Sequence, residues 1–143
     1  SFKVNTLGAI NVIKQNQEGL AKNNGSILLY STIAVKQGFT NHTIVSTAKG
    51  AIEGLTLSLA AEFAPKIRVN CIAPSLTDAK MTQKIISNDT IKKAIENMHP
   101  LPKIGTGEDF SDIGSFLLSD KNSWITGQIL HIDGGRSTLR IKS

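Results

Sequence analysis

Three short apolar runs, separated by longer segments of helical pattern, constrain the fold of this chain more than any other feature. The runs are SILLYST (26–32), IRVNCIAP (67–74) and GQILHIDGG (127–135). They are apolar along nearly their whole length, which is typical of strands that helices cover on both faces. Strands that alternate with helices form parallel sheets with right-handed crossovers. We therefore predict an α/β fold around a parallel sheet of about three strands.

The segments between these runs carry apolar residues at helical spacing. The predicted helical segments are 2–22, 42–64, pieces of 78–99, and 107–119. Residues 36–41 are expected to form a polar loop. The segment 42–64 is rich in small residues, which allow another helix or a sheet to approach closely. Its buried stripe is expected to consist of Ile52, Leu55, Leu59 and Phe63.

Polar or turn-forming residues follow each predicted strand. They are Ser31-Thr32, Ala73-Pro74-Ser75 and Asp133-Gly134. In parallel α/β sheets the ligand crevice lies at the carboxyl ends of the strands. We therefore expect a functional site to be built from these three turns.

Four stretches, in order along the chain, resemble the short-chain dehydrogenase/reductase family. They are VNTLGAINV, GSILLYSTIAV, VSTAKGAIEGLTLSLAAEFAPKIRVNCIAPS and WITGQILHIDGG. They are similar, respectively, to the family's asparagine-bearing helix, its fifth strand with the serine loop, its catalytic helix with the sixth strand, and its last strand. The resemblance covers essentially the entire chain. It implies a partial Rossmann-like, doubly wound parallel sheet, with residues 1–143 as the C-terminal portion of such a domain.

The resemblance also implies catalytic positions. The family's catalytic helix carries Y-x-x-x-K, in which the lysine holds the ribose of the nicotinamide cofactor and the tyrosine exchanges a proton with the substrate. Lys49 occupies the lysine position, and Val45 occupies the tyrosine position. Thr32, thirteen residues before Val45, offers a hydroxyl in place of the family's serine, which holds the substrate oxygen. Asn5 occupies the position of the asparagine that anchors a proton-relay water.

Valine at position 45 has no ionisable proton and suits only packing. Loss of a general acid typically lowers the rate about 10²–10⁴-fold. That loss corresponds to roughly 3–5.5 kcal/mol of transition-state stabilisation. Any remaining activity would take its proton from solvent or from His42, so we expect weak activity or none.

The resemblance implies NAD or NADP as cofactor, bound through Lys49, Pro74 and Thr77. The family usually reads P-G-x-x-x-T after the sixth strand, whereas this chain has Ser75 for the glycine and Ala79 for the threonine. The family's glycine-rich turn, T-G-x-x-x-G-x-G, is absent from the sequence. That turn holds the cofactor pyrophosphate. We therefore expect cofactor binding only in a longer protein, and a bare first-strand edge unless a second copy covers it.

Composition and sequence patterns narrow the kinds of partner, metal site and location that are expected. The chain has 143 residues and a net charge of +5, with basic residues spread along it, which does not favour nucleic-acid binding. A single cysteine, Cys71, lies in an apolar run and is expected to be buried and inert, and no metal site is expected. There is no apolar segment of membrane-spanning length and no signal-peptide pattern, so a cytoplasmic location is expected.

Two functions remain open. The first is an NAD(P)-dependent oxidoreductase that moves hydride to or from a carbonyl or alcohol of a small-molecule substrate, with an impaired site. The second is a non-catalytic module that oligomerises. Family members commonly form dimers and tetramers through their two long helices, so a homo-oligomer is expected in either case.

Overall fold

The central strand β2 (Arg68–Pro74) is the most deeply buried element of the computed structural model, which describes residues 1–142. Each side chain from Val69 to Ala73 is at most 1% exposed. β2 pairs in parallel with β1 (Ser26–Tyr30) and with β3 (Ile129–Ile132), so the sheet order is β1-β2-β3. The predicted parallel α/β fold is therefore confirmed.

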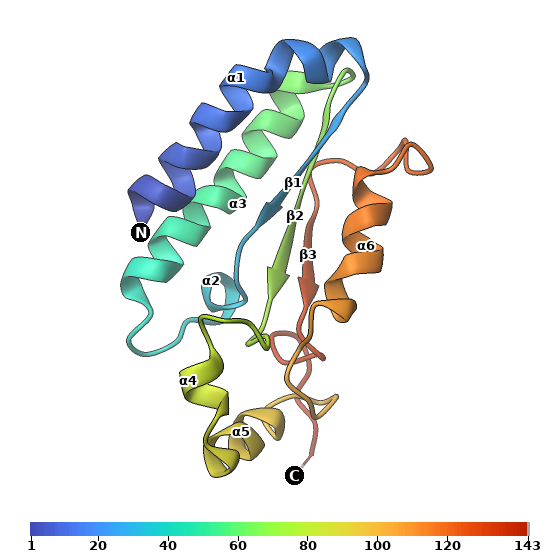
Figure 1. Cartoon of the computed structure of the whole chain (residues 1–143). Helices are drawn as coiled ribbons and strands as arrows, with labels where there is room; N and C mark the ends of the chain where they lie inside the picture. The colour runs from blue at the N-terminus through green and yellow to red at the C-terminus, as the bar shows by residue number, and fades with distance from the viewer. Residues whose placement is uncertain (143) are drawn as a thin grey trace.

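Helices cover both faces of this sheet. The helical elements are η1 (Lys3–Leu7), α1 (Gly8–Lys22), α2 (Ala34–Gln37), α3 (Thr43–Phe63), α4 (Gln83–Ile86), α5 (Asp89–Glu96) and α6 (Glu108–Leu118). Figure 1 shows α1 and α3 side by side on one face and α6 on the other. The carboxyl ends of the three strands point toward α2, α4, α5 and the C-terminus, which gathers the loops that follow the strands at one edge.

Two sequence expectations about local structure need correction. The first predicted helix exists, but its opening turn is the π-helix η1, which contains Asn5. The predicted loop 36–41 is partly helical, because α2 extends to Gln37. The amides of Lys36 and Gln37 both donate to the carbonyl of Ile33, closing a short turn directly after β1. These local bonds outweigh the polar composition on which the loop was predicted.

The buried stripe of α3 also differs from the expected one. It consists of Ala48, Ile52, Thr56 and Ala60, whereas Leu55, Leu59 and Phe63 are only partly buried. Small side chains let the helix axis lie close to β2 and to η1. At Ala48 this approach is close enough for the buried Thr6 hydroxyl to donate to the Ala48 carbonyl at 3.1 Å. The small residues of α3 therefore lie in the contact that fixes η1.

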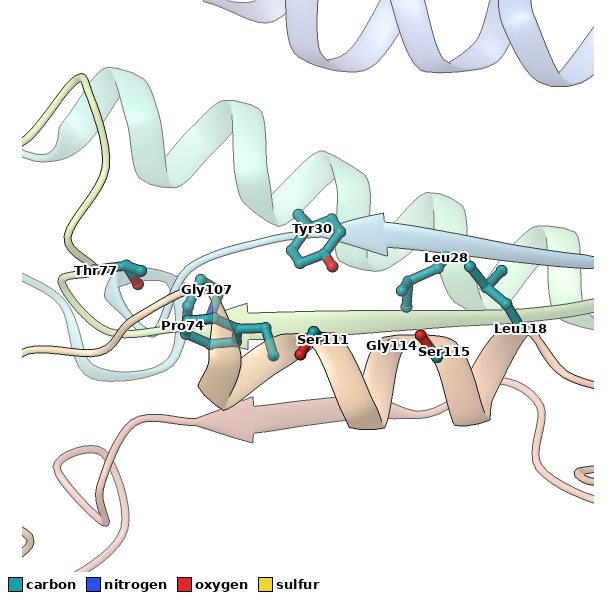
Figure 2. Close-up of a pocket in the computed structure, with 10 residues that line it drawn as sticks. Leu28, Tyr30, Pro74, Thr77, Gly107, Ser111, Gly114, Ser115 and Leu118 are labelled. Atoms are coloured by element: carbon teal, nitrogen blue, oxygen red, sulfur yellow. The ribbon is translucent and has the colours of Figure 1, made fainter.

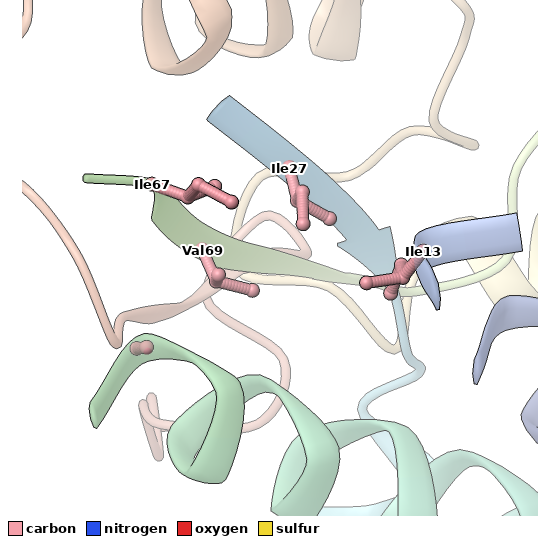
Figure 3. Packing of buried hydrophobic residues seen from close by; sticks show 5 residues of the cluster. Ile13, Ile27, Ile67 and Val69 are labelled. Carbon is pink, nitrogen blue, oxygen red and sulfur yellow. The ribbon is translucent and has the colours of Figure 1, made fainter. Parts of the chain in front are cut away.

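A compact apolar cluster lies between the helical face and the sheet (Figure 3). It joins Ile13 of α1, Ile27 of β1, Ala60 of α3, and Ile67 and Val69 at the start of β2. All five side chains are at most 9% exposed. Because four elements meet there, this cluster holds the two long helices to the amino-terminal half of the sheet.

The outer edge of β1 has no partner strand within residues 1–142. A cavity of about 540 Å³ lies between β1, the end of β2 and α6, lined in part by Leu28, Tyr30 and Gly114 (Figure 2). On α6 the small residues Ser111, Gly114 and Ser115 line its middle, and Phe110 and Leu118 line it at the two ends of the helix. No helix in the described part of the chain has the length and apolar character needed to cross a membrane.

The close contact at Ala48 gives a testable prediction. Ala48→Leu adds three carbons where η1 meets α3, and it should lower the free energy of unfolding by about 1–3 kcal/mol, the usual cost of overpacking. Ala61→Leu makes the same change on the exposed face of α3 and should have little effect. Urea denaturation measures both. Equal effects of the two substitutions would contradict the close helix approach.

Candidate active site

Lys49 lies on α3 and reaches the carboxyl end of β1. Its Nζ atom donates a hydrogen bond to the carbonyl of Tyr30 at 2.9 Å. The side chain is partly buried, and this burial lowers the pKa of the Lys49 ammonium below its ordinary value. An ammonium has three donors, and the Tyr30 carbonyl occupies one of them. Lys49 therefore presents a positive charge with free donors at the end of the first strand.

Thr32 follows the same strand, two residues after Tyr30. Its Oγ1 accepts a hydrogen bond from the amide of Ala34 at 3.3 Å, which leaves its hydroxyl proton free to donate. The next amide, that of Ile33, donates to the carbonyl of Pro74 at 3.1 Å and joins this turn to the end of β2. The Lys49 ammonium and the turn that carries Thr32 thus both lie at the carboxyl end of β1.

Val45 lies one helical turn before Lys49 on α3 and is 36% exposed. It offers only hydrocarbon. His42, the alternative proton source, is the N-cap residue of α3. Its Nδ1 lies 2.8 Å from the carbonyl of Thr40, and its ring meets the ring of Phe39 edge-on. Because a carbonyl only accepts, Nδ1 carries a proton and donates it to Thr40.

Asn5 is in the π-helix η1, a kind of turn that is frequent at functional sites. Its Nδ2 donates to the carbonyl of Ser1 at 2.9 Å. The neighbouring bond from Thr6 to Ala48 docks this turn against α3, one residue before Lys49. The structure therefore brings the turn that carries Asn5 to the helix that carries Val45 and Lys49.

Pro74 and Thr77 line the cavity on the α6 face of the sheet (Figure 2). The hydroxyl of Thr77 donates to the carbonyl of Ser75 at 3.1 Å, and Thr77 forms an isolated bridge with Gly105. Tyr30 also lines this cavity, but Thr32, Val45 and Lys49 do not. The predicted cofactor residues therefore form two groups, Pro74 and Thr77 at the cavity and Lys49 outside it. Tyr30 connects the two groups, because it lines the cavity and its carbonyl accepts the bond from Lys49.

Sequence reasoning missed a polar cluster beneath Lys49. The buried hydroxyl of Ser31 donates to Glu53 at 2.6 Å and lies 3.4 Å from the carbonyl of Lys49. Cys71 of β2 faces this cluster. Burial, reinforced by the Glu53 carboxylate, raises the pKa of the Cys71 thiol from 9.0 to about 11. Cys71 is fully buried, as predicted. No short motif joins these residues, which come from three elements.

The structure buries His99 beside the strand ends. Its Nε2 lies 2.7 Å from the hydroxyl of Ser75, and its Nδ1 lies 2.8 Å from the carbonyl of Ile95. Since the Ile95 carbonyl only accepts, Nδ1 carries the proton and Nε2 accepts from Ser75. Ser75, where the family has glycine, thereby ties the end of β2 to the segment after α5. Within residues 1–142, no group of three or more His, Cys, Asp or Glu is arranged to hold a metal ion.

Comparisons with known proteins point to the same family that the sequence resembles. Residues 1–137 match a family model described as Enoyl-(Acyl carrier protein) reductase. The chain is 36% identical to L-xylulose reductase of Bos taurus over 138 residues, which covers 94% of this chain and 57% of that protein. The chain spans about half the length of the curated relatives that it matches.

Solved structures of similar proteins share the fold of this chain. A short-chain type dehydrogenase/reductase from Mycobacterium ulcerans superposes with a TM-score of 0.89 at 28% identity, covering 97% of this chain and 51% of that one. ElxO with NADP bound superposes with a TM-score of 0.86 at 34% identity, covering 94% of this chain and 56% of ElxO. A variant of ElxO has NADPH bound.

The raised pKa of Cys71 predicts a pH dependence of stability. The folded chain favours the neutral thiol, so this contribution is complete below about pH 9, the pKa in the unfolded chain, and is lost as pH rises toward about 11. Urea denaturation of wild type and Cys71→Ala between about pH 8 and 11 measures it. The wild type should lose more stability, since both proteins share every other titrating group. If the free energy of unfolding changed with pH in the same way in both proteins, a raised pKa of the Cys71 thiol would be contradicted.

Proposed function

The chain belongs to the short-chain dehydrogenase/reductase family, and on that premise we propose that it supplies the nicotinamide and substrate side of an oxidoreductase site. The observation that carries this proposal is the bond from Lys49 to the Tyr30 carbonyl, which holds an ammonium at the end of the strand that Thr32 follows. NADP(H) is the favoured cofactor, since two similar structures hold NADP and NADPH. When bound, the nicotinamide would donate or accept the hydride.

Two side chains would do the binding in this proposal. Lys49 would donate its free N–H groups to the hydroxyls of the nicotinamide ribose while keeping its bond to the Tyr30 carbonyl. Thr32 would donate its free hydroxyl proton to the carbonyl oxygen of the substrate. Both donors are already oriented by backbone contacts, so little rearrangement is needed to use them. Asn5, on the adjoining π-turn, would hold a water near Lys49.

Proton transfer is the step that this arrangement lacks. Val45 occupies the turn of α3 from which a phenol would reach the substrate oxygen, and it holds no proton. His42 is close in sequence, but its Nδ1 proton is donated to Thr40. The expected activity is therefore slow hydride transfer, with water as the proton source.

The residues fit only one end of the cofactor. Lys49 and Thr32 at the end of β1, and Pro74 at the end of β2, would contact the nicotinamide and its ribose, since the Ile33 amide joins these two strand ends. A pyrophosphate needs a glycine-rich turn between a strand and a helix. In residues 1–142, the turns after β1 and β2 contain no glycine, and Gly134-Gly135 after β3 packs against Leu101 and Leu139 and leads into no helix. We propose that a glycine-rich half beyond these residues completes the site along the free edge of β1.

A second function, self-association without catalysis, has its own support. Large apolar side chains are exposed on both long helices, with Val12 of α1 at 61% and Leu57 of α3 at 51%. Burial of such side chains against a second copy would remove apolar surface from water. We propose a homo-oligomer paired through α1 and α3, which is compatible with either function.

Restoring the phenol tests the proposed reaction. Val45→Tyr, in this chain fused behind the N-terminal half of bovine L-xylulose reductase, should raise NADPH-dependent carbonyl reduction about 10²–10⁴-fold, the usual contribution of a general acid. Val45→Phe is the matched control, since it adds the ring without the hydroxyl. Loss of NADPH absorbance with a panel of small ketones and aldehydes measures the rate. No gain in a fusion that binds NADPH, or an equal gain from phenylalanine, would contradict the proposal.

Cofactor affinity tests the role of Lys49. In the same fusion, Lys49→Met should raise the dissociation constant for NADPH about tenfold or more, because a charge-assisted hydrogen bond to the ribose is lost. Lys14→Met removes an exposed lysine on α1 and should leave the affinity unchanged. Titration followed by NADPH fluorescence measures both. Unchanged affinity in Lys49→Met would remove Lys49 from the binding site.

A further inference from the structure

A second cavity lies at the carboxyl edge of the sheet, apart from the one in Figure 2. It has a volume of about 420 Å³ and lies between the segment after α5, the loop after α2 and the C-terminal segment. Figure 1 shows the C-terminus beside α5 at this edge. Its lining combines apolar side chains, including Phe39, Met98 and Leu139, with two arginines, Arg136 and Arg140.

The guanidinium of Arg136 is held without an acidic partner. It lies over the ring of Phe39, 4.7 Å from the ring centre, and one Nη donates to the Ser75 hydroxyl at 3.4 Å. The other Nη contacts the sulfur of Met98 at 3.4 Å. Among residues 1–142, no carboxylate forms an ion pair with Arg136. Burial lowers its pKa below the ordinary value, so its charge is poorly compensated by solvent.

Asp133 is the acid whose charge acts on Arg136, but its oxygens are used elsewhere. One oxygen accepts the amide of Gly135 at 2.9 Å, and the other accepts the amide of Ser137 at 2.9 Å. These bonds hold the turn after β3 and lower the pKa of the Asp133 carboxyl against the opposing effect of its burial. The guanidinium has five N–H donors, of which two have the contacts described above. Three donors therefore remain for a ligand.

We infer that this cavity binds the carboxylate of a small organic acid, with Arg136 holding the carboxylate and Phe39, Met98 and Leu139 contacting its apolar body. A planar guanidinium fork matches a carboxylate in geometry, and stacking on an aromatic ring leaves the donors at its edge accessible. A phosphate is the competing anion, since a second arginine, Arg140, also lines the cavity. The hydrocarbon body of an organic acid would in addition bury the apolar side chains of the lining, which a phosphate does not.

The cavity adjoins the candidate active site through two contacts. Arg136 touches Ser75, and the preceding residue, Pro74, accepts the Ile33 amide beside Thr32. Phe39 meets the ring of His42 at the start of α3, the helix that carries Lys49. If the hydride transfer proposed above holds, on which this last step rests, the substrate is an oxo acid or a hydroxy acid.

Direct binding to the 143-residue chain, without cofactor, tests the cavity separately from hydride transfer. Hexanoate is the probe, hexanamide is its neutral match, and inorganic phosphate tests the other anion. Titration followed by two-dimensional ¹H–¹⁵N NMR should show saturable shifts at the Arg136 Nε–H and at the Phe39 amide with hexanoate only. Absence of shifts at these two sites, or equal shifts with hexanamide or phosphate, would overturn the inference.

Substitutions of Arg136 test whether its guanidinium binds the carboxylate. Arg136→Met should raise the dissociation constant for hexanoate about tenfold or more, while Lys121→Met, which removes an exposed remote lysine, should leave it unchanged. Arg136→Lys keeps the charge but loses the fork, and it should give an intermediate affinity. Unchanged affinity in both Arg136 variants would overturn the inference. If Arg136→Met does not fold, the lysine variant and the shifts in the wild type decide the outcome.

Discussion

The pairing of β2 on both sides is the constraint on which the rest of the structure depends. Its side chains are buried on both faces, and its backbone bonds to β1 and β3. The buried Asn70 amide adds a bond to the Ile125 carbonyl and accepts the Gln128 amide, which positions the loop before β3. Because all three strands are parallel, their carboxyl ends meet at one edge. Every candidate functional residue on a strand end depends on that arrangement.

The contacts that orient the candidate active site do not require a tyrosine at position 45. Lys49 is held by the Tyr30 carbonyl, the Asn5 turn by the bond from Thr6 to Ala48, and Thr32 by the Ala34 amide. The polar acceptors and donors are largely backbone groups, so valine can occupy the helix without loss of the surrounding geometry. The hydrogen bonds that position Lys49, Thr32 and the Asn5 turn are therefore independent of the side chain at position 45.

Much of the fold could be predicted, because strands and long helices have local signatures. Apolar runs identified all three strands, and the parallel order followed from their alternation with helices. The errors arose where packing decides. The buried stripe of α3 passes through Ala48 and Thr56 instead of Leu55 and Leu59, since close approach of the helix to β2 favours small side chains there. Residues 34–37 became helical through amide bonds to Ile33, which polar composition does not reveal.

The sequence by itself determined the family, the order of the strands' segments, and the presence of hydrocarbon where a phenol is expected, since these follow from residue type and short spacing. Only the tertiary structure decided which polar groups meet. Ser31 pairs with Glu53, Ser75 pairs with His99, and Arg136 lies over Phe39. Each pair joins residues at least 22 positions apart, from different elements. Strand register and helix docking bring them together, and no local pattern encodes that geometry.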